Sequence, residues 1–392
     1  MKTRYLIGLA TVILSIFLLV GKSAVLTMLR PEQASSQKTV LFQKTQAASA
    51  KEQLADCRPH SESVVRASRA PSPEGLRLVM AAGSGNTATV ASLLASGIPV
   101  DSVRDVGWTA MYVAAVDGHL HMADFLVKAG AAADQPNIDG NRPLSAARTR
   151  EMAEFFIRNG ADVRAVNDIG RTALHNAIDY QADEVAALLL SHGADVNARW
   201  FGCRTALQVA AYRGRLSTLE LLQSKGAELN LRDKDGKTAL HEAIEQKQDA
   251  AARWLVQKGT DTNIADASGI TPLMRALLVH NEDLAVYLLS SGADFKPFSA
   301  QGETAMHIAA GYASLAMVRL LIDKGTDVNA QPENGGSPLD RAEQRGDKDI
   351  VQLLLGRGAQ MEKYRCEFDG KTYTKGIVRR GGCPFGWTST KL

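Results

Sequence analysis

The chain has 392 residues, of which 45% are hydrophobic, 22% are charged and 6% are aromatic. This composition is typical of a globular protein, and it excludes global disorder, a collagen-like chain and a protein with many membrane spans. The formal net charge is +3, but the positive charge is concentrated towards the two ends, so residues 74–361 are acidic. An acidic body argues against nucleic-acid binding, which needs a basic face. Four cysteines exclude a dense disulfide scaffold.

The N-terminal segment, residues 1–29, has the charge and hydropathy pattern of a membrane anchor. Lys2 and Arg4 precede an uncharged apolar run from Tyr5 to Val20, which resumes after Lys22. We expect an uncleaved signal anchor, a single transmembrane helix with the rest of the chain on the extracytoplasmic (periplasmic or extracellular) side. Two alternatives stay open, namely a signal peptide that is cleaved so that the protein is secreted, and a buried helix of a protein without a membrane span. The small residues that a cleavage site requires are poorly placed here.

Residues 30–73 form the next segment. They are rich in Ser, Ala, Gln and Pro and contain only short apolar patches. This composition predicts a flexible stem without chemistry of its own.

A period of 33 residues organises residues 74–361. The tetrads Thr172–His175, Thr238–His241 and Thr304–His307 lie two periods apart, with related tetrads between them. A second signature, such as Gly193–Asn197, follows each tetrad. The threonine can cap a helix, the next helix has an apolar stripe of period 3.6, and the glycine can end it in a left-handed conformation.

This pattern resembles the ankyrin repeat, whose known signature is T-P-L-H at the start of a first helix and G-A-D-V-N after a second. The resemblance implies an all-α solenoid of about nine repeats with β-turn or hairpin tips. The first unit lacks the tetrad, as expected of a terminal cap. The third is short near Arg148–Glu151, between its helices. In the fifth, Cys203 stands where other units have glycine and Gly202 is moved back by one, so we expect a distorted turn.

Residues 362–392 break the period and predict a small β-hairpin module. Tyr364–Phe368 and Lys371–Thr374 alternate in polarity around the turn signal Asp369–Gly370. Two further segments are candidates for a third strand or for packing residues: Ile377–Val378 and Pro384–Trp387.

The cysteines suggest one disulfide. Because so small a module buries little surface, we expect Cys366 and Cys383 to pair with each other and staple it. A zinc site is the rival, but the module has no histidine to complete a tetrahedral set. Cys57 and Cys203 are expected to stay free or to pair between chains.

No catalytic motif is recognisable in the chain. The sequence has no G-x-S-x-G, P-loop, H-E-x-x-H or C-x-x-C pattern. His175, His241 and His307 recur with the repeat, so they are interpreted as structural groups that hydrogen-bond between repeats. We therefore expect no enzyme activity, no cofactor, no metal and no small-molecule substrate.

Function is expected to reside on the surface formed by the tips and first helices, which is the concave side of ankyrin-like stacks. Variable positions there form a basic, aromatic stripe, and these side chains dominate interface energies. The stripe consists of Trp108, Arg171, Arg199, Trp200, Phe201, Arg204, Tyr212, Arg213, Lys237 and Arg275. It predicts an acidic protein partner; the alternative is a solvated face whose aromatics cover repeat junctions.

The sequence thus predicts a non-catalytic protein–protein interaction scaffold, displayed outside the cytoplasm on a membrane anchor. Two other functions stay open. One is a regulator or assembly factor of a membrane-bound enzyme, for example in stress or peroxide defence, and the other is an exported effector.

Overall fold

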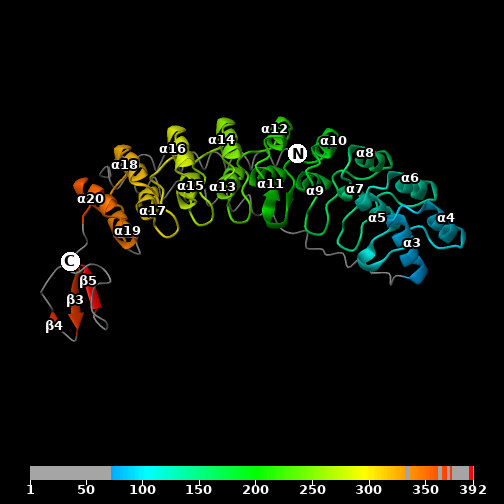
Figure 1. Ribbon diagram of the computed structural model, residues 1–392, viewed down its shortest axis with the longest axis horizontal. Coiled ribbons are helices and arrows are strands. Elements are labelled where there is room, and N and C mark those ends of the chain that lie inside the picture. The colour runs from blue at the N-terminus through cyan, green and yellow to red at the C-terminus, as the bar shows by residue number, and fades with distance from the viewer. Residues whose placement is uncertain (1–71, 332–335, 361–363, 369–370, 373–387, 392) are drawn as a thin grey trace, which may run out of the picture. The chain divides into compact units, whose positions relative to one another are not determined.

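The computed structural model describes residues 72–331, 336–360, 364–368, 371–372 and 388–391 (Figure 1). The predicted signal anchor and all but the last two residues of the predicted stem lie outside these ranges. Within them, no helix has both the length and the apolar character needed to cross a membrane.

Residues 73–356 form consecutive pairs of short helices. Their bounds are α3 (Pro73–Gly83) and α4 (Thr87–Ala95), α5 (Ala110–Asp117) and α6 (Leu120–Lys128), α7 (Pro143–Ala146) and α8 (Arg150–Arg158), α9 (Ala173–Asp179) and α10 (Asp183–Ser191), α11 (Ala206–Tyr212) and α12 (Leu216–Ser224), α13 (Ala239–Glu245) and α14 (Asp249–Gln257), α15 (Pro272–Leu278) and α16 (Glu282–Ser290), α17 (Ala305–Tyr312) and α18 (Leu315–Asp323), and α19 (Pro338–Arg345) and α20 (Lys348–Gly356).

The pairs stack in chain order, and the first helix of each pair contacts the first helix of the next, as α11 does with α13 and α17 with α19. In Figure 1 the first helices, from α3 to α19, and the second helices, from α4 to α20, lie in two rows. Small residues of the first helices, such as Ala114, Ala210 and Ala309, are fully buried. Their size allows helices to approach closely, so the core runs continuously from pair to pair.

Every first helix except α7, whose N-cap residue is Arg142, begins at a serine or threonine cap. Thr172 accepts a hydrogen bond from the backbone of His175 at the start of α9, and His175 Nδ1 accepts in return from the backbone N–H of Thr172, at 3.3 Å. Because Nδ1 accepts, the ring proton is on Nε2, which donates to the carbonyl of Ala198, 3.1 Å away. The imidazole therefore links its own helix cap to the loop that leads into the next unit.

Two further units repeat this arrangement. His241 Nδ1 accepts from the backbone of Thr238 at 3.2 Å, and its Nε2 donates to Ile270 O at 3.1 Å. In α11 a glutamine takes the same place. Gln208 Oε1 accepts from the backbone of Thr205 at 2.8 Å, and its Nε2 donates 2.8 Å to the carbonyl of Lys237.

The turns that precede the first helices, here called tips, are joined in series by backbone hydrogen bonds. Each bond runs from the N–H of one tip to a carbonyl of the preceding tip. The bonds are Asp168 N to Asp139 O at 3.0 Å, Phe201 N to Ile169 O at 3.0 Å, Lys234 N to Gly202 O at 2.8 Å, Ala267 N to Asp235 O at 2.8 Å, and Ala300 N to Ser268 O at 2.8 Å.

The tip before α11 differs from the others, as its sequence predicts. Strands β1 (Arg199–Trp200) and β2 (Arg204–Thr205) flank a 3₁₀ turn at Phe201–Cys203. Gly202 and Cys203 both have left-handed backbones, with φ of 74° and 65°. Only glycine adopts this conformation without a steric cost, so Cys203 costs about 1 kcal/mol here.

Cys203 also corrects the sequence analysis. Its side chain is buried, and it is disulfide-bonded. The expectation that it stays a free thiol is therefore wrong. The side chain of its bonding partner lies outside the description.

The short unit lies where the sequence places it. Helix α7 has four residues, Pro143–Ala146, and only Ala147–Thr149 separate it from α8. The residues missing from the period are therefore lost from the end of the first helix and from the turn that follows it.

The C-terminal module contains β3 (Tyr364–Phe368), β4 (Lys371–Thr372) and β5 (Thr388–Lys391), in the antiparallel order β4-β3-β5. Strands β3 and β4 correspond in position to the predicted hairpin. The third strand is β5, which the sequence analysis does not predict, while both candidate segments lie outside the described residues. Threonine-rich β5 has the β-branched composition that strands favour. The side chains of the predicted Cys366–Cys383 disulfide also lie outside the description.

The buried histidines predict a pH-dependent stability. Burial lowers the pKa of His175 and of His241 from 6.5 to about 4. Between these values the unfolded chain binds protons that the folded chain does not, so the free energy of unfolding falls as the pH drops below 6.5. We expect a loss of about 2 kcal/mol per histidine between pH 7.5 and pH 5 in urea titrations.

The variant His241→Gln supplies the matched control, because Gln208 already makes the same hydrogen bonds in α11. This variant should keep the helical circular-dichroism signal and lose about 2 kcal/mol less than the parent over the same pH interval. Equal losses in both proteins would show that His241 does not carry the pH dependence.

Candidate protein-binding surface

Six of the predicted binding residues gather on the tips and first helices around α9 and α11. We call this group the aromatic–arginine surface. It consists of Arg171, Trp200, Phe201, Arg204, Tyr212 and Arg213.

Stacking between arginine and aromatic side chains builds this surface. The guanidinium of Arg171 lies 4.5 Å from the ring centroid of Trp200, and that of Arg204 lies 5.4 Å from the ring of Tyr212. The Trp200 ring is in turn 6.0 Å from the buried ring of His175. Trp200 and Arg204 are opposite residues in the β1–β2 pair, so the strand register brings the two stacked groups side by side.

The arginine charges are paired within the protein. Arg171 and Arg213 both form salt bridges with Asp179, the latter at 3.1 Å, and Arg204 forms one with Glu242 at 2.8 Å. This changes the electrostatic part of the sequence prediction, because the stripe is not a row of unpaired positive charges. Two guanidinium groups share one carboxylate at Asp179, so that cluster keeps a net positive charge.

The remaining members of the predicted stripe lie outside this cluster. Lys237 pairs with Glu245 at 2.5 Å on α13, and Arg275 pairs with the buried Asp266 at 2.7 Å. Trp108 lies at the start of α5, where it stacks on Arg104 and Tyr112. Arg199 is opposite Thr205 in the β1–β2 pair. The structure therefore divides the stripe into the aromatic–arginine surface and separate pairs on its flanks.

Exposed apolar side chains belong to this surface and to the tip next to it. Phe201 is 64% exposed, Ile169 on the neighbouring tip is 44% exposed and Tyr212 is 39% exposed. The backbone bond between Phe201 and Ile169 places these two tips next to each other. The ammonium of Lys234 lies 5.5 Å from the Phe201 ring. This patch can bind an apolar side chain of a partner, with cations around it.

The sequence analysis misses the residues that complete the surface. Ile169 and Lys234 lie on the neighbouring tips, and Asp179 and Glu242 are the charge partners of the arginines. The sequence does indicate one kind of contact between side chains of the same unit. A basic residue before the cap threonine meets the residue eight positions later, as in Arg171 with Asp179.

The same spacing recurs in the next two units. It relates Arg204 to Tyr212, where the contact is a cation–π stack, and Lys237 to Glu245, where it is an ion pair. The repeat therefore offers one slot that is filled by a carboxylate or by an aromatic ring.

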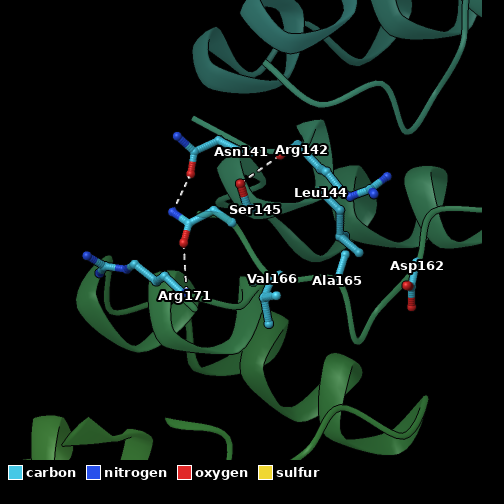
Figure 2. Close-up of a pocket in the computed structure, with 11 residues that line it drawn as sticks. Asn141, Arg142, Leu144, Ser145, Asp162, Ala165, Val166 and Arg171 are labelled. Carbon is cyan, nitrogen blue, oxygen red and sulfur yellow. Dashed lines mark hydrogen bonds between the residues drawn. The ribbon is translucent and has the colours of Figure 1, made fainter. Parts of the chain in front are cut away.

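Figure 2 shows a small cavity beside the short helix α7. It is lined by Asn141, Arg142, Leu144, Ser145, Asp162, Ala165, Val166 and Arg171, among others. Its volume of about 10 Å³ is roughly that of one water molecule. Within the described residues, the shortened unit therefore does not create a small-molecule site.

A shallow groove of about 470 Å³ lies near the turns between α13 and α14 and between α15 and α16, and it includes Asp249, Asn281 and Glu282. The carboxylates of Asp249 and Glu282 accept hydrogen bonds from Asn281 and from Ser314. In the described part of the chain, no group of three or more His, Cys, Asp or Glu residues could hold a metal ion.

Comparison with protein families agrees with this architecture. A model described as ankyrin repeats (3 copies) matches residues 78–167, 130–200, 207–299 and 273–365, and a second, described as ankyrin repeats (many copies), matches residues 179–223. The chain belongs to the ankyrin repeat family. Its ankyrin repeats indicate a protein–protein interaction scaffold, and the family suggests a non-enzymatic role.

Similarity to curated proteins is confined to short stretches. Glycerophosphocholine phosphodiesterase gde1 of Schizosaccharomyces pombe is 46% identical over 59 residues, which are 15% of this chain and 5% of that protein. The inactive serine/threonine-protein kinase TEX14 of Mus musculus is 31% identical over 93 residues, which are 23% of this chain and 6% of its own. Human protein phosphatase 1 regulatory subunit 27 is 34% identical over 87 residues, 21% of this chain and 56% of its own. The chain thus spans about half or less of the length of each.

The buried ion pair on this ankyrin surface predicts a stability effect. The Glu242 side chain is 7% exposed, and burial raises its pKa. Replacing Arg204 by methionine keeps the stem that lies against Tyr212 but leaves this carboxylate unpaired. We expect Arg204→Met to lower the free energy of unfolding by about 2 kcal/mol at pH 7.5, measured by urea denaturation.

The second substitution Glu242→Gln, added to Arg204→Met, should restore most of this loss because it removes the unpaired charge. If the double variant is as unstable as Arg204→Met alone, the loss comes from packing and not from the charge.

Proposed function

We propose that this chain is a protein-interaction scaffold whose binding site is the aromatic–arginine surface together with Ile169. The observation that supports this most is the 64% exposure of Phe201 in the same tip as the stacked side chains of Trp200 and Arg204. The neighbouring rings and guanidinium groups are held by stacking and ion pairs before any partner arrives. These side chains therefore lose little conformational entropy when a partner binds.

The chemistry of the surface favours one kind of partner. An apolar side chain on the partner would cover Phe201 and Ile169, as buried centres of interfaces do. A carboxylate beside it would approach the cluster in which Arg171 and Arg213 share Asp179. The partner is thus a protein segment with an apolar residue next to an acidic one, and it need not be acidic throughout.

We also propose that the repeats act outside the cytoplasm. The uncharged run Tyr5–Val20 supports export. The disulfide at Cys203 supports it independently, because disulfides persist in oxidising compartments. A signal anchor would keep the scaffold at the membrane, and a cleaved signal peptide would release it.

A second function is a regulator of a membrane-bound enzyme that uses the same surface. Similarity to a curated protein that is named as a phosphatase regulatory subunit favours this alternative. The two functions differ in whether the bound partner changes its catalytic rate.

The binding proposal is tested in two steps. Crosslinking and mass spectrometry of the full-length chain, solubilised in detergent, first identify a partner and its contact residues. The double variant Phe201→Ala and Tyr212→Ala should then raise the Kd for the purified partner at least tenfold, about 1.4 kcal/mol. Both side chains are exposed, so the thermal midpoint should stay within about 2 °C of the parent.

Val286→Ala is the matched control, because Val286 is 45% exposed on α16, in the other row of helices. This variant should bind like the parent. Crosslinks confined to the second helices, or equal losses in both variants, would place the binding site elsewhere.

The location is tested by protease protection. Protease added to intact cells or spheroplasts should digest the repeats, since export puts them on the outer side of the membrane, and an antibody to residues 74–361 would follow the digestion. A cytoplasmic marker protein should survive the same treatment. Repeats that are degraded only after lysis would contradict the proposed topology.

A further inference from the structure

Arg148 lies where the repeat is shortened. Helix α7 has four residues and the next first helix, α9, has seven, so α7 is shorter by about one turn. Arg148 is in the turn between α7 and α8, and its guanidinium lies 4.6 Å from the ring centroid of Tyr180, which caps the end of α9. The early end of α7 thus brings a cation of one unit onto an aromatic ring of the next.

Arg148 differs in its charge from the arginines of the aromatic–arginine surface. Arg171, Arg204 and Arg213 all form salt bridges. Arg148 is exposed, and its side chain forms no salt bridge with any residue that the structure describes. Stacking uses the face of the guanidinium, so the N–H donors along its edge are available to an acceptor from outside.

The ring of Tyr180 also places Arg148 beside the charged cluster at Asp179. Tyr180 is 45% exposed and directly follows Asp179 in the chain. Because Arg171 and Arg213 share that one carboxylate, the cluster keeps one surplus positive charge. Arg148 adds a second positive charge, and neighbouring positive charges attract an anionic group more strongly than either alone.

This cationic region lies at some distance from the exposed ring of Phe201. Phe201 is in the tip before α11, whereas Tyr180 is at the opposite end of α9, one unit back. A helix of this length rises about 11 Å, and neighbouring helices lie roughly 8–10 Å apart. The two places are therefore roughly 15–20 Å apart, which is the length of about five extended residues.

We propose, building on the proposed function, that Arg148 binds the carboxylate of an acidic residue about five positions from the apolar residue that covers Phe201. A carboxylate fits this position because it accepts two parallel hydrogen bonds from one guanidinium. Stacking on Tyr180 holds the guanidinium before the partner arrives, so little of its freedom is lost on binding. The partner segment then crosses the ends of the first helices and has a defined direction.

A peptide selected for binding is the probe for this contact. A phage-displayed library of random peptides of about twelve residues, enough to span both places, is selected on the full-length chain in detergent. The binders are synthesised with a fluorescent label, and anisotropy at low salt, where charge pairs are least screened, gives each Kd. The variant Arg148→Gln should raise the Kd about fivefold, because it removes a charge-assisted pair.

Arg158→Gln is the matched control, because it removes the same charge from the same unit. Arg158 is exposed on α8, in the other row of helices, so the Kd of this variant should stay within about twofold of the parent. Both substitutions are at exposed positions, so the thermal midpoint should stay within about 2 °C of the parent.

A double-mutant cycle locates the contact on the peptide. Each acidic residue of the peptide is changed in turn to its amide. One such change should weaken binding to the parent about fivefold and should alter binding to Arg148→Gln by less than about twofold. Additive losses for every acidic residue would overturn the assignment to Arg148.

The variant Phe201→Ala separates this contact from the proposed function. If Phe201→Ala weakens the selected peptides and Arg148→Gln weakens none, the role of Arg148 is overturned and the proposed surface stands. If neither variant weakens any peptide, or if no peptide binds the parent, both proposals are overturned. Equal weakening by Arg148→Gln and Arg158→Gln would overturn the role of Arg148, because it would report net charge alone.

Discussion

The buried, hydrogen-bonded side chain at the start of first helices such as α9, α11 and α13 is the contact on which the stacking depends. In α9 and α13, a threonine caps the helix, a histidine returns the bond to the threonine backbone, and the same imidazole reaches a carbonyl of the loop leading into the next unit. One side chain thus sets the helix start and the distance to its neighbour. Since no single unit buries its own apolar face, this spacing lets the alanine-lined helices share one core and aligns the tips in series.

Much of this could be predicted because the determinants are local and repeat. The caps, the period of 33 and the deletion beside α7 are visible in the sequence, and each acts within one unit or between adjacent units. The charge pairing could not be predicted in the same way. Whether Arg213 meets Asp179, or Arg204 meets Glu242, depends on side chains from two units, and on how far each tip is turned. A single repeat does not contain that information.

The pairing of the arginines affects what the surface can recognise. An unpaired basic row would attract many acidic proteins through long-range forces that salt screens. Here most of the charge is neutralised by Asp179 and Glu242, so recognition depends on contact with Phe201 and its neighbours. Arginines that are stacked on Trp200 and Tyr212 also lose less freedom when a partner binds. Such a surface favours a shaped partner over a merely charged one.

The irregular tip before α11 concentrates the departures from the repeat in one turn. Its backbone bonds to both neighbouring tips persist, from Phe201 to Ile169 and from Lys234 to Gly202, so the left-handed strain at Cys203 does not interrupt the stack. Strained backbone of this kind is retained where the surrounding structure fixes it, and it clusters at functional sites. Because an exposed ring and a buried cystine occupy the same short turn, a change in the oxidation state of Cys203 would act on the position of Phe201 directly. No residue outside this turn is needed to couple the oxidation state of Cys203 to the position of Phe201.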